Sequence, residues 1–191
     1  RDFCLSRGLG DVYKRQSISR ERYDMTSMYI GALGEAVFLT GDDAGRQSFL
    51  DGDMLIVPGG TLCGVESGSG AVYTEIIIKK EINMNNLVKA GEVMKLKNLI
   101  QYEEGSISNL DIVSNPTMKF VLMAFDEGTG LQPHRAPGNA IIFALEGKAV
   151  IGYEGKDYTI SAGENFRFEK NGLHSVTADG KFKMALLLVI E

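Results

Sequence analysis

Two histidines, His134 and His174, are the only imidazole side chains in the sequence, and imidazole is the group best suited to chemistry near neutral pH. Gly128 lies six residues before His134 and Gly147 thirteen after it, while Gly163 lies eleven residues before His174. Turn-forming glycines therefore flank both histidines. Such a pair could bind a divalent metal, transfer a proton or hydrogen-bond a ligand, so it is the first candidate for a functional site.

A dedicated site for iron, zinc, manganese or nickel needs more than two imidazoles. A third ligand would have to come from Gln132, Asn139 or water, or be absent. The alternative is that His134 and His174 are metal-free polar groups lining a ligand-binding cavity, with Gln132 and Asn139 as secondary contacts. Both interpretations predict that a small molecule binds at the histidine pair.

Two other residues carry reactive or charged groups. Cys63 has no histidine or cation close to it in the sequence that would lower its pKa, so we predict a small buried hydrophobe. Arg167 lies between Phe166 and Phe168 and, by strand alternation, faces away from them. If its face lines the cavity, Arg167 is a candidate anchor for an anionic ligand.

Short apolar or alternating runs separated by glycine turns fill the sequence after residue 16, a pattern typical of β-strands. In the C-terminal half the predicted strands cover residues 140–145, 148–153, 157–161, 165–169 and 181–190. Asp179-Gly180 predicts a hairpin turn before the last strand, whose alternate residues from Phe182 to Ile190 share an apolar face. We therefore expect an all-β fold, built as an antiparallel sandwich or barrel.

An internal repeat predicts two such units in tandem. Gly34-Glu35-Ala36-Val37 matches Gly147-Lys148-Ala149-Val150, Gly52-Asp53 matches Gly163-Glu164, and Cys63 matches His174. The predicted domains are a truncated first repeat at residues 17–80, a connector at 81–96 and a complete second repeat at 97–191. The first repeat is expected to lack its opening strands, because nothing before Tyr23 has a strand pattern that could supply them.

The first sixteen residues have a different origin in this interpretation. The run Asp11-Val12-Tyr13-Lys14-Arg15-Gln16, with the residues before it, resembles the translation of an adapter used in sequencing libraries. Residues 1–16 are therefore expected to be a non-native scar, to be left out of fold reasoning together with Cys4.

The composition is that of a folded protein without a basic surface. Hydrophobic residues make up 44% and charged residues 24%, which are ordinary values for a globular chain. The net charge of −5 argues against nucleic acids and anionic membranes as partners, and no apolar run approaches the roughly 20 residues that span a bilayer. With two cysteines and no recognisable signal peptide, the expected compartment is the cytoplasm.

The glycine and histidine pattern resembles the cupin superfamily, whose jelly-roll barrels carry two short motifs. Gly128, His134 and Gly147 match the first motif, in which Ala136 replaces a second histidine and Ala140 a glutamate. Residues 134–140 are also similar to a cupin subgroup that reads His-x-Ala-Pro-Gly-(Asp/Glu)-Ala, with the amide Asn139 in place of the acid.

The second motif is present in both repeats. In the second repeat Gly163 and His174 match it, and three positions depart from it: Glu169, Asn171 and Ala178. In the first repeat the matching residues are Gly52, Pro58 and Gly60, with Cys63 in place of the histidine and Ser67 in place of the asparagine. The resemblance covers residues 23–78 and 91–191.

This resemblance implies two tandem jelly-roll barrels, a bicupin, that binds a small molecule in the C-terminal barrel through His134 and His174, with a weakly held divalent metal or none. One alternative is a metal-dependent cupin enzyme of the isomerase, lyase or dioxygenase class. The other is a structural or dimerisation bicupin without activity. A homodimer is expected, because exposed strand edges in the incomplete first barrel favour pairing between subunits.

Overall fold

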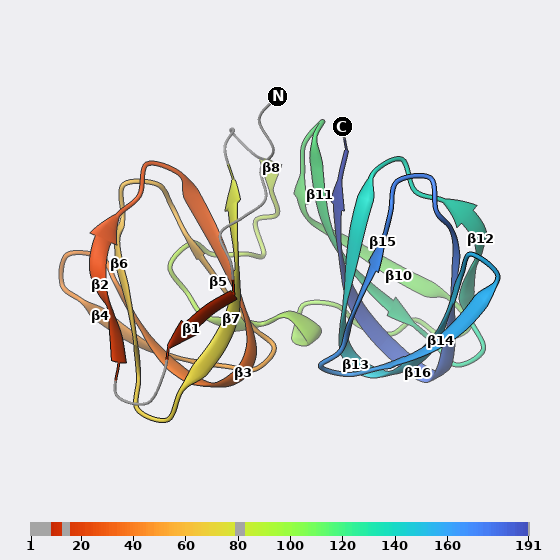
Figure 1. Ribbon diagram of the computed structural model, residues 1–191, viewed down its shortest axis with the longest axis horizontal. Coiled ribbons are helices and arrows are strands. Elements are labelled where there is room, and N and C mark those ends of the chain that lie inside the picture. Colours follow the sequence, from red (N-terminus) through yellow and green to blue (C-terminus); the bar gives the residue numbers. More distant parts are fainter. Residues whose placement is uncertain (1–8, 13–15, 79–82, 191) are drawn as a thin grey trace. The chain divides into compact units, whose positions relative to one another are not determined.

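The computed structural model describes residues 9–12, 16–78 and 83–190, and the regular structure in them is β-strand apart from one 3₁₀ turn, η1 (Leu96–Asn98). Two compact units divide these residues. The N-terminal unit holds β1 to β7 and β9, and the C-terminal unit holds β8, η1 and β10 to β16. In each unit the strands curl around an interior of their own (Figure 1), and each unit contains antiparallel pairs throughout. The prediction of an all-β fold with two antiparallel units in tandem is confirmed.

The N-terminal unit is built on one long strand, β3, which pairs with four others: β4, β5, β6 and β7. The strands are β1 (Leu9–Val12), β2 (Gln16–Arg22), β3 (Thr26–Thr40), β4 (Gly45–Leu50), β5 (Asp53–Val57), β6 (Leu62–Ser67), β7 (Ala71–Ile78) and β9 (Met94–Lys95). Its interior contains a cluster of aromatic rings, in which Phe38 contacts Tyr29, Phe49 and Tyr73 at centroid distances of 4.8, 4.7 and 5.8 Å. All four rings are at most 5% exposed, so their burial stabilises this core.

The C-terminal unit is built on two long strands that pair along most of their length, β13 and β16. Its strands are β8 (Asn83–Met84), β10 (Ile107–Ser114), β11 (Met118–Phe125), β12 (Gly130–Arg135), β13 (Asn139–Tyr153), β14 (Lys156–Ser161), β15 (Asn165–Phe168) and β16 (Leu173–Val189). Phe182 and Met184 are buried in its core, and Leu186 and Leu188 pack against it, so the predicted apolar face of the last strand is confirmed.

Two glycines at matching places confirm that the units repeat one design. Gly34 in β3 has φ 76° and Gly147 in β13 has φ 74°, a backbone region that favours glycine. A Cβ at Gly34 would lie 2.3 Å from the carbonyl oxygen of Gly70, and one at Gly147 would lie 1.9 Å from that of Lys181. At each position the long strand changes partners (β4 follows Gly34 and β14 follows Gly147), so the glycine lets the strand bend between two neighbours.

Two local expectations are wrong. Strand β2 lies before Tyr23 and pairs with β6, so the first unit does have a strand there. Asp179-Gly180 does not form a hairpin, because β16 runs through both residues, with Gly180 at φ 77°. The sequence alternates on both sides of Gly180, as it does within a single long strand. A glycine with positive φ lets such a strand bend without forming a turn.

The connector predicted at residues 81–96 is not a free linker in its described part. Asn83–Met84 pairs with β10 in the C-terminal unit, whereas Met94–Lys95 pairs with β5 in the N-terminal unit. The Lys95 ammonium also lies 2.9 Å from the Asp53 carboxylate, whose side chain is almost fully buried. Of the residues interpreted as an adapter scar, 9–12 form β1 against β7 and Gln16 begins β2, and the rest lie outside the described residues.

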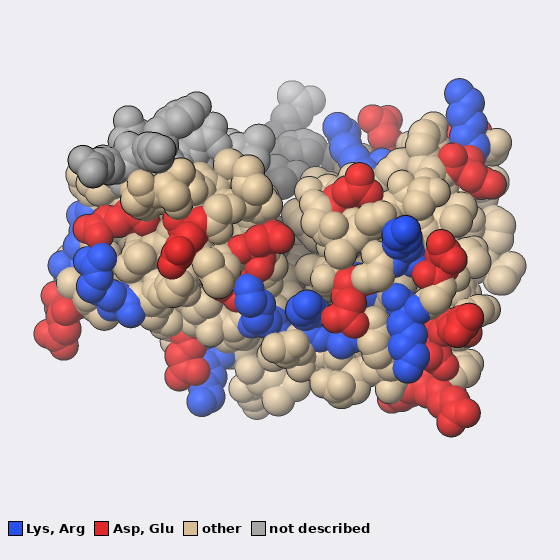
Figure 2. Space-filling view, turned by 90° about the horizontal axis from the view of Figure 1, so that it is seen from below, with Lys and Arg blue, Asp and Glu red and all other residues tan. Residues whose placement is uncertain are grey.

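Charges of both signs are interspersed over the face seen in Figure 2. Ion pairs between exposed side chains include Arg46 with Glu66 at 2.9 Å and Lys97 with Glu146 at 3.8 Å. No helix in the described residues is long and apolar enough to cross a membrane.

Candidate functional site

His134 and His174 lie opposite one another in the C-terminal unit. They are register partners on β12 and β16, and their ring centroids are 4.2 Å apart. An irregularity in the pairing between Leu131 and His134 sets this alignment. His134 is exposed and His174 is only 7% exposed, so one ring of the pair lies at the protein surface and the other is buried.

Both rings make the same kind of hydrogen bond, from Nδ1 to the main-chain carbonyl group two residues earlier. His134 Nδ1 lies 2.9 Å from the oxygen of Gln132, and His174 Nδ1 lies 3.0 Å from the oxygen of Gly172. A carbonyl oxygen can only accept, so each Nδ1 carries the proton and donates it. In the neutral rings Nε2 is then left as an unprotonated acceptor.

Burial makes His174 a poor base. The pKa of His174 is lowered from its usual 6.5, chiefly because burial disfavours the charged ring. The Gly172 carbonyl acts in the opposite direction, and the charge of His134 adds to the lowering. His174 is therefore neutral at pH 7 and presents Nε2 as an acceptor.

An aromatic wall supports the buried histidine. His174 stacks on Phe168 with a centroid distance of 4.2 Å and an interplanar angle of 25°. Phe168 in turn contacts Phe166 and Tyr153 at 5.2 and 5.6 Å. Gly172 is required beside this wall, since a Cβ there would lie 2.7 Å from the Tyr153 ring. Tyr153 and Phe168 were not among the predicted site residues. Strand alternation in the sequence did predict that Phe166 and Phe168 share one face.

Gln132 and Asn139 take different positions from those expected of secondary contacts. Gln132 is exposed and reaches His134 through its main-chain oxygen. Asn139 lies on β13 next to Ala140, which belongs to the core, so strand alternation turns its side chain to the opposite face. There its Oδ1 accepts a hydrogen bond of 3.1 Å from the Lys170 amide. A ligand-binding role for His134, His174, Gln132 and Asn139 stays a prediction.

The donor set does not fit a dedicated metal site. Within the part of the chain that the structure describes, no group of three or more His, Cys, Asp and Glu residues could hold a metal ion. Ala136 and Ala140, where the cupin motif has its other ligands, are 7% and 2% exposed. Two imidazoles alone supply too few ligands for the iron, zinc, manganese or nickel site considered from the sequence.

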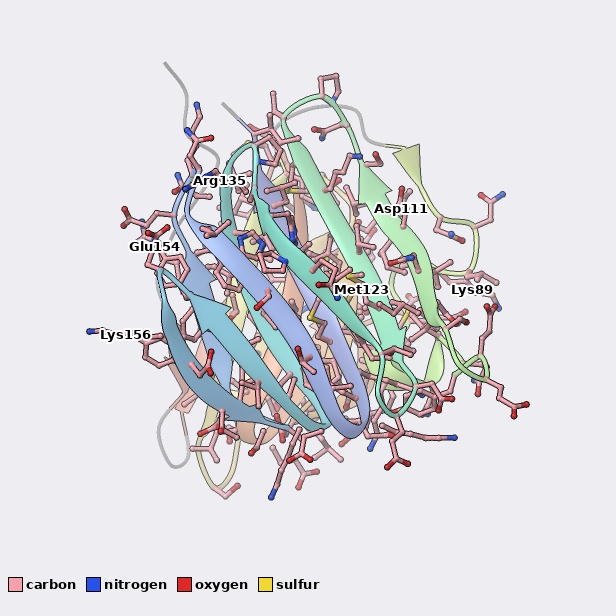
Figure 3. All side chains as sticks on the ribbon, turned by 90° about the vertical axis from the view of Figure 1, so that its right-hand side faces the viewer. Lys89, Asp111, Met123, Arg135, Glu154 and Lys156 are labelled. Carbon is pink, nitrogen blue, oxygen red and sulfur yellow. The ribbon has the colours of Figure 1, made fainter. Side chains whose placement is uncertain are left out.

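The nearby arginines have partners of their own. Arg167 lies on the face of β15 opposite to Phe166 and Phe168, with its side chain 64% exposed, and pairs with Glu169 at 3.4 Å. It is therefore outside the barrel interior, and the prediction of an anion anchor fails. Arg135 hydrogen-bonds the main chain of Asn171 and lies 3.9 Å from the Glu154 carboxylate, and the two labelled side chains are close together at one end of the unit in Figure 3.

Cys63 behaves as predicted, as a small buried side chain. It is a free thiol with 5% exposure in the apolar core of the N-terminal unit. Burial raises its pKa to about 11, since the thiolate would lose hydration. It occupies the position that His174 has in the second unit: Cys63 pairs in register with Glu21 of β2, as His174 pairs with His134 of β12.

Comparisons with known proteins agree with the fold. Residues 121–190 match the family described as Cupin domain, a segment that contains both histidines. A search of curated proteins finds no match. Among solved structures, the Cupin 2 conserved barrel domain protein from Leptotrichia buccalis is similar with a TM-score of 0.81 and 25% identity, covering 95% of this chain and 81% of that one.

Two more distant structures show the fold alone. A cupin superfamily protein from Desulfitobacterium hafniense has a TM-score of 0.53 and 17% identity, over 59% of this chain and 100% of that chain. Salicylate 1,2-dioxygenase from Pseudaminobacter salicylatoxidans has a TM-score of 0.69 and 12% identity, over 95% of this chain and 70% of that chain.

The fold and the family match define a cupin-domain protein with two jelly-roll barrels in tandem. The domain at residues 121–190 belongs to the cupin superfamily, which confirms the resemblance drawn from the glycine and histidine motifs.

Proposed function

We propose that the C-terminal barrel binds a small molecule that donates hydrogen bonds to His134 and His174, without a resident metal. The observation that carries this proposal is the pair of Nδ1 contacts to main-chain oxygens, which leaves two Nε2 acceptors on neighbouring rings. A ligand with a hydroxyl or N–H group would satisfy these acceptors.

The surroundings favour a ligand with a flat apolar part. Phe168 stacks on His174, and Tyr153 and Phe166 extend the same aromatic wall. Arg167 faces outward, so it would not form an ion pair with an anionic ligand in the barrel interior. A neutral ring that carries a hydroxyl group fits both features, because the ring contacts the wall while the hydroxyl meets an imidazole.

The test starts with metal and then uses two probes that differ in one donor. Metal content is measured on protein purified without chelator, and Fe²⁺, Zn²⁺, Mn²⁺ and Ni²⁺ are titrated by calorimetry. Binding of phenol and of anisole, whose oxygen is methylated and cannot donate, is then followed by NMR in the wild type, His134→Ala and His174→Ala. The matched control is Arg167→Ala, which lies outside the interior.

We expect no stoichiometric metal, and phenol binding at least about tenfold tighter than anisole binding, a difference of about 1.4 kcal/mol. Each histidine variant should remove this preference, and Arg167→Ala should keep it. Equal binding of the two probes would contradict the proposal. Stoichiometric metal that is lost in His134→Ala would instead favour the metal-dependent enzyme.

The cytoplasmic location and the homodimer remain predictions, and gel filtration tests the homodimer.

A further inference from the structure

The N-terminal unit contains a carboxylate on the inner face of its barrel. Glu75 lies on β7 two residues after Tyr73 and four after Ala71, both of which are buried in the core of this unit. Strand alternation therefore points Glu75 to the same interior face. It is paired in register with Tyr29 of β3, another member of that core.

Among the described residues, hydrogen bonds reach one oxygen of this carboxylate. The hydroxyl groups of Ser27 and Tyr29 donate to Glu75 Oε1 at 3.0 and 3.1 Å, and both donors are at most 5% exposed. In the described ranges 9–12, 16–78 and 83–190, no ion pair reaches Glu75 and no hydrogen bond reaches its Oε2. Glu75 is part-buried beside the aromatic core, so its Oε2 is left as an acceptor for a ligand that carries a cation or an N–H group.

The groups around Glu75 are neutral. Burial raises the pKa of Tyr73 to about 12, with Glu75 as the next cause, and raises the pKa of Tyr29 with contributions from Cys63 and Glu75. The Cys63 thiol, with its pKa at about 11, is also uncharged at pH 7. Arg20 acts on the pKa of Cys63, and its guanidinium donates to the main-chain oxygens of Gly41 and Asp42.

Aromatic rings adjoin this carboxylate. Tyr29 and Tyr73 are 5.7 Å apart at an angle of 71°, and both contact Phe38. The faces of phenol and benzene rings attract a cation, most strongly where water is excluded. A negative group beside such rings is the chemistry that recognises an ammonium ion.

We propose that Glu75, Ser27, Tyr29 and Tyr73 form a second binding site in the N-terminal barrel, which takes a small organic cation such as a primary amine. The ammonium group contacts Glu75 Oε2, and its hydrocarbon part lies against the tyrosine rings. Ser27 and Tyr29 hold the carboxylate in place through Oε1.

The C-terminal barrel lacks this arrangement. Measured from the equivalent glycines Gly34 and Gly147, the positions of Ser27 and Tyr29 are occupied there by Ala140 and Ile142. Ile142 pairs with Leu186 where Tyr29 pairs with Glu75. The two barrels therefore differ in charge at matching positions, and the proposed amine site is independent of the histidine site.

The experiment uses the full chain and three probes of similar size: benzylamine, which is protonated at pH 7, neutral benzyl alcohol and anionic benzoate. Methylamine is added as a smaller cation. Binding is measured by NMR titration and by the shift of the thermal midpoint, since a ligand that binds the folded state stabilises it. The variants are Glu75→Gln, which keeps an oxygen acceptor for Ser27 and Tyr29, and Glu35→Gln, an exposed glutamate on β3 as matched control.

At the N-terminal unit, followed through the NMR signals of its own residues, we expect an amine to bind at least about tenfold more tightly than benzyl alcohol, with benzoate weakest. Glu75→Gln should lose this preference while it keeps the fold, and Glu35→Gln and His134→Ala should keep the preference. The proposal is overturned if neither amine binds, if Glu75→Gln binds the amine as the wild type does, or if His134→Ala abolishes amine binding.

Discussion

His134 on β12 and His174 on β16 are register partners whose rings lie 4.2 Å apart, one exposed and the other buried. Each donates its Nδ1 proton to the carbonyl group two residues earlier, so the two Nε2 atoms are equivalent acceptors in different surroundings. The buried ring is the one whose pKa is lowered. Stability, metal binding and ligand binding should therefore respond differently to changes at the two positions.

Acid should destabilise the protein through His174. Its pKa in the folded state lies below the usual 6.5, so the unfolded chain takes up a proton at a pH where the folded protein still resists it. The stabilising contribution is present above about pH 6.5 and is lost as the pH falls through the folded-state pKa. Urea unfolding at pH 7.5 and 5.0 should show a smaller loss in His174→Gln than in the wild type. An equal loss in both proteins would contradict this assignment.

Metal binding should be recoverable by restoring the missing ligands. Ala136 and Ala140 occupy the places of the histidine and the glutamate in the cupin motif, and both are buried. The double variant Ala136→His/Ala140→Glu should bind Zn²⁺ or Ni²⁺ at least about tenfold more tightly than the wild type, because it completes a four-ligand set. Calorimetry measures the affinity, and adding His174→Ala to the double variant should remove the gain. If that triple variant still binds the metal tightly, the ion is held elsewhere.

Replacing Gly147 should cost far more stability than replacing Gly155. Both glycines have positive φ, 74° and 78°, so alanine is strained at either position by about 1 kcal/mol. Only at Gly147 would the new Cβ also collide with main chain, at 1.9 Å from the Lys181 oxygen, whereas Gly155 has nothing within 4 Å. We expect Gly147→Ala to lower the free energy of unfolding by roughly 3 kcal/mol or more, measured by urea unfolding. Similar losses in the two variants would show that φ alone decides.

Cys63 should resist thiol reagents in the folded protein. Its side chain is 5% exposed, so a reagent has little access to the sulfur atom. Burial also raises its pKa to about 11, so only a small fraction of the thiol is ionised to thiolate at pH 8. In a Cys4→Ser background, reaction with an aromatic disulfide reagent should be slow and should reach one equivalent only when urea unfolds the chain. A fast reaction in the native protein would show that the N-terminal barrel opens readily.

The sequence by itself determined the fold class and the places of the two histidines. Glycine turns and two-residue alternation are local properties, so β15, the apolar face of β16 and the repeat of Gly34 and Gly147 follow from it directly. The family resemblance came from the same spacing of glycine and histidine. Local sequence misjudged Asp179-Gly180, because a bend within one long strand and a hairpin turn use the same residues.

The tertiary structure decided which side chains meet. Register between strands far apart in sequence brings His134 to His174 and Tyr29 to Glu75, and a slip of one residue would invert every face. It also turned Asn139 and Arg167 away from the interior and revealed the Phe168 wall. Hydrogen-bond partners, burial and shifted pKa values depend on these long-range pairings, which no local pattern specifies.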